Sequence, residues 1–133
     1  MDWILEVVPV PVSNLDRAKD FYSTQVGFTL DLDIQISPDT RIIQLTPPGS
    51  TCSIHLSTGP MPPGSVSGLQ LVVTDLDAAQ TELSNRGVPV TEIMHFDQGT
   101  RLPGRGDPWN NFIFFDDPDG NSWVIQERPA TPD

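Results

Sequence analysis

The feature that most constrains the fold of this chain is an internal repeat. The segment VPVPVSNLDRAKDFYSTQVGF, residues 8–28, is similar to LQLVVTDLDAAQTELSNRGV, residues 69–88. Val12 matches Val73, which gives an offset of 61 positions (73 minus 12). A repeated pattern of this kind predicts two similar supersecondary units. We expect each unit to contain a strand, a capped helix, a glycine and a further strand.

The first repeat begins with a β-branched run over residues 7–12, which suits a strand. Because Pro9 and Pro11 lack amide donors, this strand is expected at a sheet edge or in an irregular pairing. Ser13 or Asn14 is predicted to cap the helix that follows. The helix and its flanking strand therefore follow from local chemistry alone.

In the second repeat, Thr74 or Asp75 is predicted to cap the helix. Gly27 and Gly87 are expected to end the two helices, because a left-handed residue is favoured there. Residues 95–110 are expected to form one long irregular loop, which in a compact domain is usually functional or mobile. Further strands are predicted near residues 28–34, 41–46, 52–57, 67–74, 88–94, 111–116 and 122–127.

The length of 133 residues fits one domain over 1–133, with repeat 1 at about 3–57 and repeat 2 at about 67–127. The net charge of −11 disfavours nucleic acid and anionic membranes as partners. No long apolar segment or leader pattern is present. A lone cysteine, Cys52, forms no intramolecular disulfide. These features favour a cytoplasmic protein.

Three segments taken together carry a family resemblance: VSNLDRAKDFYSTQVGF, VVTDLDAAQTELSNRGV and FFDDPDGNSWVIQE. In this order and spacing they resemble the vicinal-oxygen-chelate superfamily, which includes glyoxalase I, extradiol dioxygenases and bleomycin-resistance proteins. The LTPPGSTCSI stretch is similar to a glyoxalase-like branch of it. The resemblance, which covers nearly all of residues 3–127, implies an α+β fold with two βαβββ modules forming a cupped mixed sheet around a ligand cavity. It also implies a homodimer, because the superfamily often pairs modules across two chains.

Enzymes of this superfamily hold a divalent metal with His or Glu at four strand positions. Carried onto this sequence, the four positions fall on Val7, His55, Gly68 and Val124. Valine and glycine side chains offer no donor atom, and a single imidazole holds a metal only weakly. The resemblance therefore predicts a protein without a metal or other cofactor. The DPDGN segment is interpreted as a structural hairpin turn.

Polar side chains on predicted strands are the first group of candidate ligand contacts. His55 lies between Ile54 and Leu56, so it is either a core histidine or a cavity-lining group. Gln70 points to the same strand face as Gly68, because residues two apart share a face. Gln44 is a further candidate of the same kind.

Aromatic side chains form the second group of candidates. Trp109 lies in the predicted loop, where an aromatic residue is typical of a lid or an interface anchor. Phe112, Phe114 and Trp123 provide enough aromatic surface to line an apolar pocket. Core packing is the favoured interpretation for Phe112 and Phe114, and Phe114 is kept as a candidate pocket residue.

The charged residues of the loop leave two interpretations open. Arg101 and Arg105 either neutralise Asp97 and Asp107 in solvent or recognise a ligand carboxylate or phosphate. His95 is expected to be a solvated loop residue.

Glu127 is expected at the rim or in solvent, on the face opposite Val124, because an odd separation reverses the face of a strand.

The preferred function is binding of a small, partly apolar organic molecule in a cavity that holds no metal. The main rival is an enzyme, a lyase, isomerase or dioxygenase with a non-standard metal site around His55. A third possibility is a structural partner without a ligand of its own. Metal content separates the first two hypotheses, and a ligand-induced rise in stability separates the first from the third.

Overall fold

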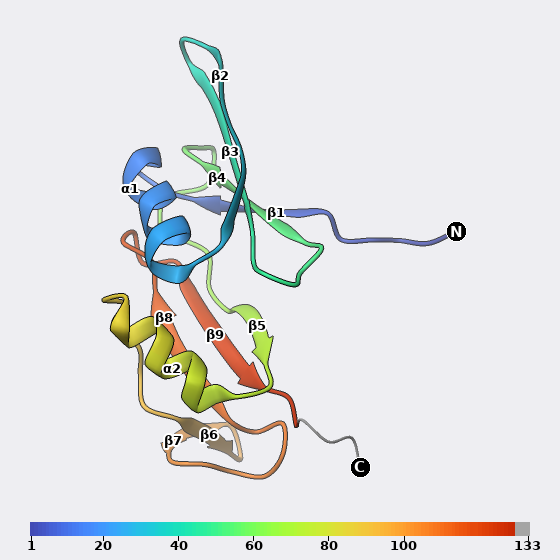
Figure 1. The fold of residues 1–133 in the computed structure, drawn as a ribbon, viewed down its shortest axis with the longest axis vertical. Helices are drawn as coiled ribbons and strands as arrows, with labels where there is room; N and C mark the ends of the chain where they lie inside the picture. Colours follow the sequence, from blue (N-terminus) through green and yellow to red (C-terminus); the bar gives the residue numbers. More distant parts are fainter. Residues whose placement is uncertain (130–133) are drawn as a thin grey trace. The chain divides into compact units, whose positions relative to one another are not determined.

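The computed structural model describes residues 1–129, and the chain divides into two compact units (Figure 1). Unit 1 contains residues 1–66 and the short segment Asp117–Asn121. Unit 2 contains Ser67–Asp116 and, of the described residues, 122–129. Unit 2 thus begins at Ser67, where the second repeat begins. That the two units form one domain over 1–133 stays a prediction.

Unit 1 has a four-stranded mixed sheet in the order β1-β4-β3-β2. Strand β1 runs parallel to β4, and the other neighbours are antiparallel. The proline-containing strand β1 is an edge strand, as its missing amide donors predict. The elements in chain order are β1 (Val7–Pro11), α1 (Leu15–Asp20), the π-helical η1 (Phe21–Val26), β2 (Thr29–Ser37), β3 (Thr40–Thr46) and β4 (Ser53–Ser57).

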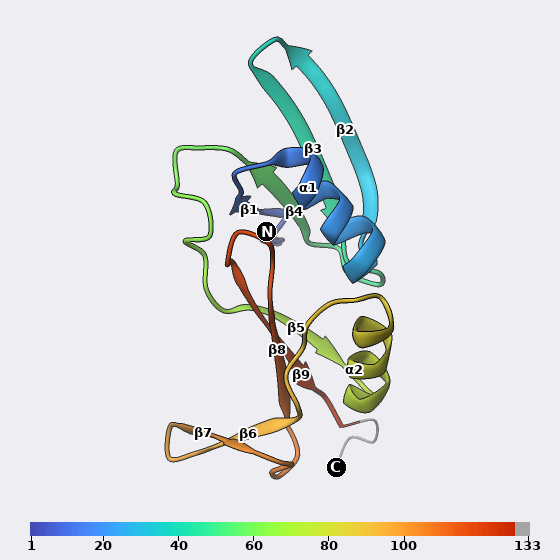
Figure 2. The same cartoon turned by 90° about the vertical axis from the view of Figure 1, so that its left-hand side faces the viewer.

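Unit 2 has a five-stranded mixed sheet in the order β5-β9-β8-β6-β7 (Figure 2). Strand β5 runs parallel to β9, as β1 does to β4 in unit 1. The elements are β5 (Leu69–Val73), α2 (Leu76–Asn85), β6 (Met94–Asp97), β7 (Thr100–Pro103), β8 (Phe112–Asp116) and β9 (Ser122–Glu127). The α+β class and the two-module plan are confirmed: each module has its own mixed sheet, and neither sheet is closed. The expected cup around a ligand cavity stays a prediction.

Local side chains fix where the helices start and stop. The side chain of Asn14 accepts a hydrogen bond from the Arg17 amide at 3.0 Å, and that of Asp75 accepts one from the Ala78 amide at 3.0 Å. Gly27 ends η1 with φ of 93°, a conformation that suits glycine. The predicted caps at Asn14 and Asp75 are therefore confirmed.

Each unit buries its own hydrophobic core. In both, the helix covers one sheet face with residues recurring at helical spacing, and the strands contribute every second residue. The core of unit 1 consists of Val10, Val12, Ala18, Phe21, Tyr22, Val26, Phe28, Ile43, Leu45, Ile54 and Leu56. The core of unit 2 consists of Leu76, Leu83, Val88, Ile113, Phe115, Trp123 and Ile125.

The DPDGN segment is the turn between β8 and β9, and it makes buried hydrogen bonds within unit 1. Asn121 Nδ2 donates to the Pro11 carbonyl and to Asp117 Oδ2, each at 2.7 Å. The Tyr22 hydroxyl donates to the same Asp117 oxygen at 2.7 Å, and the Val66 amide donates to Asn121 Oδ1 at 3.1 Å. The segment therefore has the structural role that was predicted. Through Asn121 it also binds β1 at Pro11 and the connecting segment at Val66.

The prediction of one irregular loop over 95–110 was wrong, because β6 and β7 form a hairpin there. Its two turn residues, Gln98 and Gly99, have φ of 51° and 82°. Positive φ at both positions is the type I′ geometry that matches the twist of paired strands. The strand expected near 88–94 is also absent until Met94, since residues 88–93 have no regular strand pairing.

Among residues 1–129, no helix is long and apolar enough to cross a lipid bilayer.

Candidate functional site

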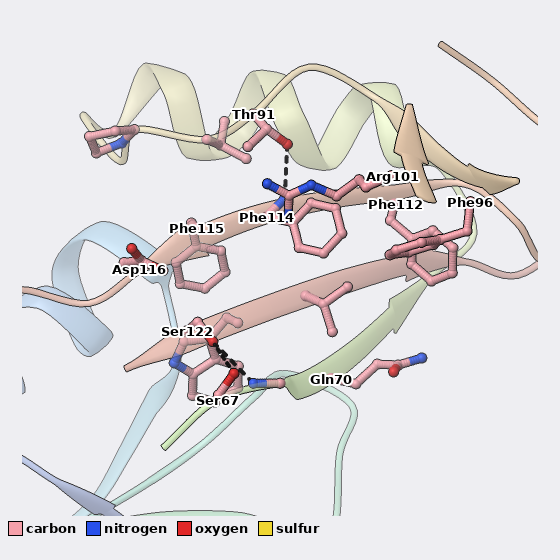
Figure 3. A pocket seen from close by; sticks show the side chains of 15 residues that line it. Ser67, Gln70, Thr91, Phe96, Arg101, Phe112, Phe114, Phe115, Asp116 and Ser122 are labelled. Atoms are coloured by element: carbon pink, nitrogen blue, oxygen red, sulfur yellow. Dashed lines mark hydrogen bonds between the residues drawn. The ribbon is translucent and has the colours of Figure 1, made fainter. Parts of the chain in front are cut away.

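The strongest candidate site is a pocket of about 880 Å³ that lies entirely within unit 2 (Figure 3). We call it the unit 2 pocket. Aromatic and aliphatic side chains dominate its wall, and a few polar groups interrupt it. The lining residues are Ser67, Gly68, Gln70, Pro89, Val90, Thr91, Phe96, Arg101, Phe112, Phe114, Phe115, Asp116, Ser122, Trp123 and Val124.

The pleat of β8 decides which phenylalanines are available to a ligand. Ile113 and Phe115 are buried in the core of unit 2. Phe112 and Phe114 alternate with them and are only partly buried, so they face the pocket. The favoured interpretation of Phe112 and Phe114 as core residues was therefore wrong. The core aromatic pair is Phe115 with Trp123, whose rings stack 5.9 Å apart.

Three phenylalanines form an aromatic cluster on one wall of the pocket. The ring of Phe96 meets that of Phe112 edge-on at 5.3 Å and that of Phe114 edge-on at 6.3 Å. Phe112 and Phe114 stack with their centroids 6.3 Å apart. Phe96 is 39% exposed, so part of this aromatic surface is open to a ligand. The sequence did not single out Phe96, because its position depends on the β6–β7 hairpin.

Two of the predicted ligand contacts lie together in this pocket. Gln70 of β5 is in register with Val124 of β9, which is in register with Phe114 of β8. Gln70 and Phe114 therefore flank Val124 in one row across the sheet. The Gln70 amide donates to the side chain of Gln126 at 2.8 Å, which holds both polar groups on this face.

Arg101 of β7 reaches the same wall from the hairpin. The central guanidinium carbon lies 4.1 Å from the centroid of the Phe114 ring (Figure 3). This is a cation–π contact. The sequence allowed an ion pair of Arg101 with Asp97 or Asp107. Neither pair forms, since within residues 1–129 no ion pair is found for Arg101.

Arg105 has a structural role outside the pocket. Its guanidinium contacts Glu127 Oε1 at 2.8 Å and Asp77 Oδ2 at 2.7 Å, in place of the predicted Asp97 and Asp107. Glu127 Oε2 accepts a hydrogen bond from the Leu76 amide at 2.9 Å, in the first turn of α2. The Arg105 guanidinium, and then the Leu76 amide, hold the pKa of the Glu127 carboxyl below its usual range. Hydrogen bonds to the carboxylates of Glu127 and then Asp77 raise the pKa of Arg105.

Glu127→Gln is expected to lower the free energy of unfolding by about 1 kcal/mol at pH 7. The substitution removes a partly buried negative charge that pairs with Arg105 and lies at the N-terminus of α2. The lowered pKa of Glu127 stabilises the folded chain above the pKa of the unfolded carboxyl. The advantage of the wild type should therefore shrink as the pH falls through the folded-state pKa. Urea unfolding at several pH values measures it.

Glu82→Gln provides the matched control for this experiment. Glu82 pairs with Arg86 on the exposed surface of α2, and such pairs contribute about 0.5 kcal/mol or less. Equal effects of the two substitutions, or no pH dependence of their difference, would contradict the role given to Glu127.

The other two strand candidates lie in unit 1. His55 of β4 and Gln44 of β3 are register partners, so they are neighbours on one sheet. His55 lines a separate pocket of about 560 Å³, whose wall is more polar and includes Gln35, Asp39 and Arg41. The predicted site residues are thus divided between the two units.

Trp109 and His95 lie outside the unit 2 pocket. Trp109 is 50% exposed with φ of 73°, and its carbonyl accepts a hydrogen bond from Gln126 at 2.8 Å. Its predicted function as a lid or an interface anchor stays a prediction. His95 belongs to β6, and its Nδ1 lies 2.8 Å from the Gly104 carbonyl.

The model of the Glyoxalase/Bleomycin resistance protein/Dioxygenase superfamily matches residues 2–125. The chain belongs to this superfamily. No curated protein matches it. Solved superfamily structures resemble it over almost their whole length, as the fold of the two units leads one to expect.

Two of these structures come from Streptomyces sp. CB03234. TnmS3, an antibiotic binding protein, is 36% identical, with a TM-score of 0.77 over 96% of this chain and 97% of its own. A glyoxalase/bleomycin resistance protein is also 36% identical, with a TM-score of 0.74, and the match covers 93% of this chain and 100% of that protein. A superfamily member from Sphaerobacter thermophilus DSM 20745 is 29% identical, with a TM-score of 0.73, and the match covers 96% of this chain and 98% of that protein.

Three of the four positions onto which the resemblance carries the superfamily's metal ligands have no donor side chain: Val7, Gly68 and Val124. Pro9 and Gln70 are equivalent in the repeat, and they are in register with His55 and Val124, respectively. His55 therefore occupies in unit 1 the place that Val124 occupies in unit 2. Gly68 and Val124 offer no metal ligand in unit 2. Within residues 1–129 no group of three or more His, Cys, Asp or Glu side chains is placed to hold an ion. The residues present do not fit the superfamily's metal centre.

Proposed function

We propose that this superfamily member binds a small, partly apolar organic molecule in the unit 2 pocket without a metal ion. The observation that carries the proposal is the aromatic cluster, which leaves phenylalanine surface open in a pocket of about 880 Å³. Pockets of this size, lined by aromatic side chains with a few polar groups, are typical of small-molecule sites. Gln70 and Arg101 supply such polar groups.

The comparison with TnmS3 supports the same function. TnmS3 is an antibiotic binding protein, and it matches 96% of this chain at 36% identity. The ligand class that we propose is therefore a small organic molecule comparable to an antibiotic. Sequestration and sensing of such a compound are both consistent with binding alone. A homodimer in the cytoplasm, with the Trp109 region closing over the ligand or over the second subunit, belongs to the same proposal.

A fluorescent neutral probe, pyrene-1-carboxamide, tests the binding site in protein purified without added metal. The wild type is expected to bind it and to unfold at a higher temperature in its presence. Phe114→Ala should weaken binding by about tenfold or more, because one aromatic stacking surface is lost. Trp3→Ala, at an exposed aromatic residue of unit 1, should leave the affinity unchanged.

Elemental analysis of the same preparation separates this function from its rival. Less than about 0.1 metal ion per chain is expected, since one imidazole among apolar positions holds an ion weakly. About one ion per chain, lost in His55→Ala, would instead support the enzyme with a non-standard metal site. Equal probe affinities of the wild type and Phe114→Ala would show that the probe does not bind in the unit 2 pocket.

A further inference from the structure

Most of the basic side chains in this acidic chain are already neutralised. The chain has seven lysine and arginine residues and a net charge of −11. Five of the seven form ion pairs with carboxylates: Arg17, Lys19, Arg41, Arg86 and Arg105. Within residues 1–129 no ion pair is found for Arg101 or Arg128. Of these two, Arg101 alone lines the unit 2 pocket.

The geometry of Arg101 leaves its hydrogen-bond donors available to a ligand. Its guanidinium lies over the Phe114 ring, so one flat face of the group is covered. The N–H groups of a guanidinium point outward in its own plane, and they can bind two oxygens of a carboxylate at once. Stacking on Phe114 restricts the group while these donors stay at its edge. Arg101 is therefore held beside the aromatic cluster as an unneutralised cation.

We propose that the ligand of the unit 2 pocket is an aromatic monoanion, which rests on the function proposed above. Its ring lies on the aromatic cluster, and its acidic oxygen, a carboxylate or a phenolate, accepts hydrogen bonds from Arg101. An apolar ring and an anionic oxygen on adjacent parts of one molecule match the aromatic cluster and Arg101 on the wall of the pocket. Arg101 is thus the residue that selects the charge of the ligand.

A second charged group limits the ligand to a single negative charge. Asp116, at the end of β8, also lines the pocket, and Figure 3 shows it beside Phe115 at a different part of the wall from Arg101. No ion pair joins Asp116 to Arg101 among the described residues. A second anionic group on the ligand would meet Asp116 and the net negative charge of the chain, so polyanions are disfavoured.

A matched pair of probes tests this inference. Pyrene-1-carboxylate and pyrene-1-carboxamide share one ring system and differ in charge. The wild type is expected to bind the carboxylate about tenfold or more tightly than the carboxamide, because hydrogen bonds to charged groups are the stronger class. This preference should fall as the salt concentration rises, since Arg101 is open to solvent.

Arg101→Gln should abolish the preference. Its affinity for the carboxylate is expected to drop about tenfold or more, and its affinity for the carboxamide should fall clearly less. Arg101→Lys should lie in between, because an ammonium keeps the charge and loses the two-point geometry. Arg128→Gln is the control, since it removes an arginine outside the pocket. Unfolding temperatures check that each variant is folded.

Three results would overturn the inference: equal affinities of the wild type for both probes, equal losses for both probes in Arg101→Gln, or no binding of the carboxylate. The first two leave the proposed function intact if the carboxamide binds and Phe114→Ala weakens it. Failure of that Phe114 experiment would instead count against the pocket as a binding site. The two proposals can therefore fail separately.

Discussion

Gly64→Ala is expected to lower the free energy of unfolding by about 3 kcal/mol or more. A Cβ atom at this position would lie 2.0 Å from the carbonyl oxygen of Asp119, far inside contact distance. The obstructing atom belongs to the backbone, so no side-chain rotation relieves the clash. The residue also has φ of 77°, which disfavours any side chain. The Gly64 amide donates to Pro11, so moving the segment would cost this bond as well.

Gly49→Ala separates the clash from the backbone strain in this experiment. Gly49 has φ of 82°, and nothing lies within 4 Å of the Cβ that alanine would add. Its substitution should cost about 1 kcal/mol, from backbone strain alone. Urea unfolding followed by circular dichroism compares the two variants. Similar losses for both would show that the turn at Asp119 moves aside without difficulty.

Asn121→Ala should destabilise the chain by about 3 kcal/mol, because its side chain satisfies several buried groups at once. The substitution leaves the Pro11 carbonyl without its 2.7 Å donor and the Val66 amide without its 3.1 Å acceptor. It also removes a donor to the buried Asp117 carboxylate. Each buried polar group left unpaired costs about 1–3 kcal/mol, and relaxation recovers part of that sum. Chemical denaturation measures the loss.

Two further variants make the Asn121 result specific. Asn121→Asp keeps the shape but replaces the Nδ2 donor with an oxygen that lies next to Asp117, so it should cost at least as much as the alanine variant. Asn85→Ala, at the exposed end of α2, should change stability by less than about 0.5 kcal/mol. A mild effect of Asn121→Asp would mean that the side chain fills space and that its hydrogen bonds matter little.

The parts of the fold that depend on neighbouring residues were predictable. Asn14 and Asp75 cap their helices because a short polar side chain can reach the amide three residues on. Gly27 ends η1 because its backbone takes positive φ, and the prolines of β1 place that strand at an edge. The duplicated plan of the fold followed from the repeat, since two copies of one pattern form two similar units.

The site was only partly predictable from the sequence. Gln70 and Phe114 were named as candidates and lie in one row of the unit 2 pocket. His55 and Gln44 are neighbours on the sheet of unit 1, and Trp109 lies outside the pocket. Whether any of these residues binds a ligand stays a prediction. Phe96 and the stacking of Arg101 could not be foreseen, because Gln98–Gly99 is a weak turn signal and the β6–β7 hairpin was therefore missed.

By itself the sequence determined the number of units, their helices and the absence of donor side chains at three of the four positions onto which the resemblance carries the metal ligands. These properties depend on residue type and short-range spacing, which the order of amino acids contains directly. Only the tertiary structure decided which phenylalanines of β8 line the pocket and that the arginine beside them forms no ion pair with a carboxylate of the described residues. These two properties depend on strand register and on partners far away in the chain. Arg105 pairs with Glu127, and Arg101 stacks on the ring of Phe114.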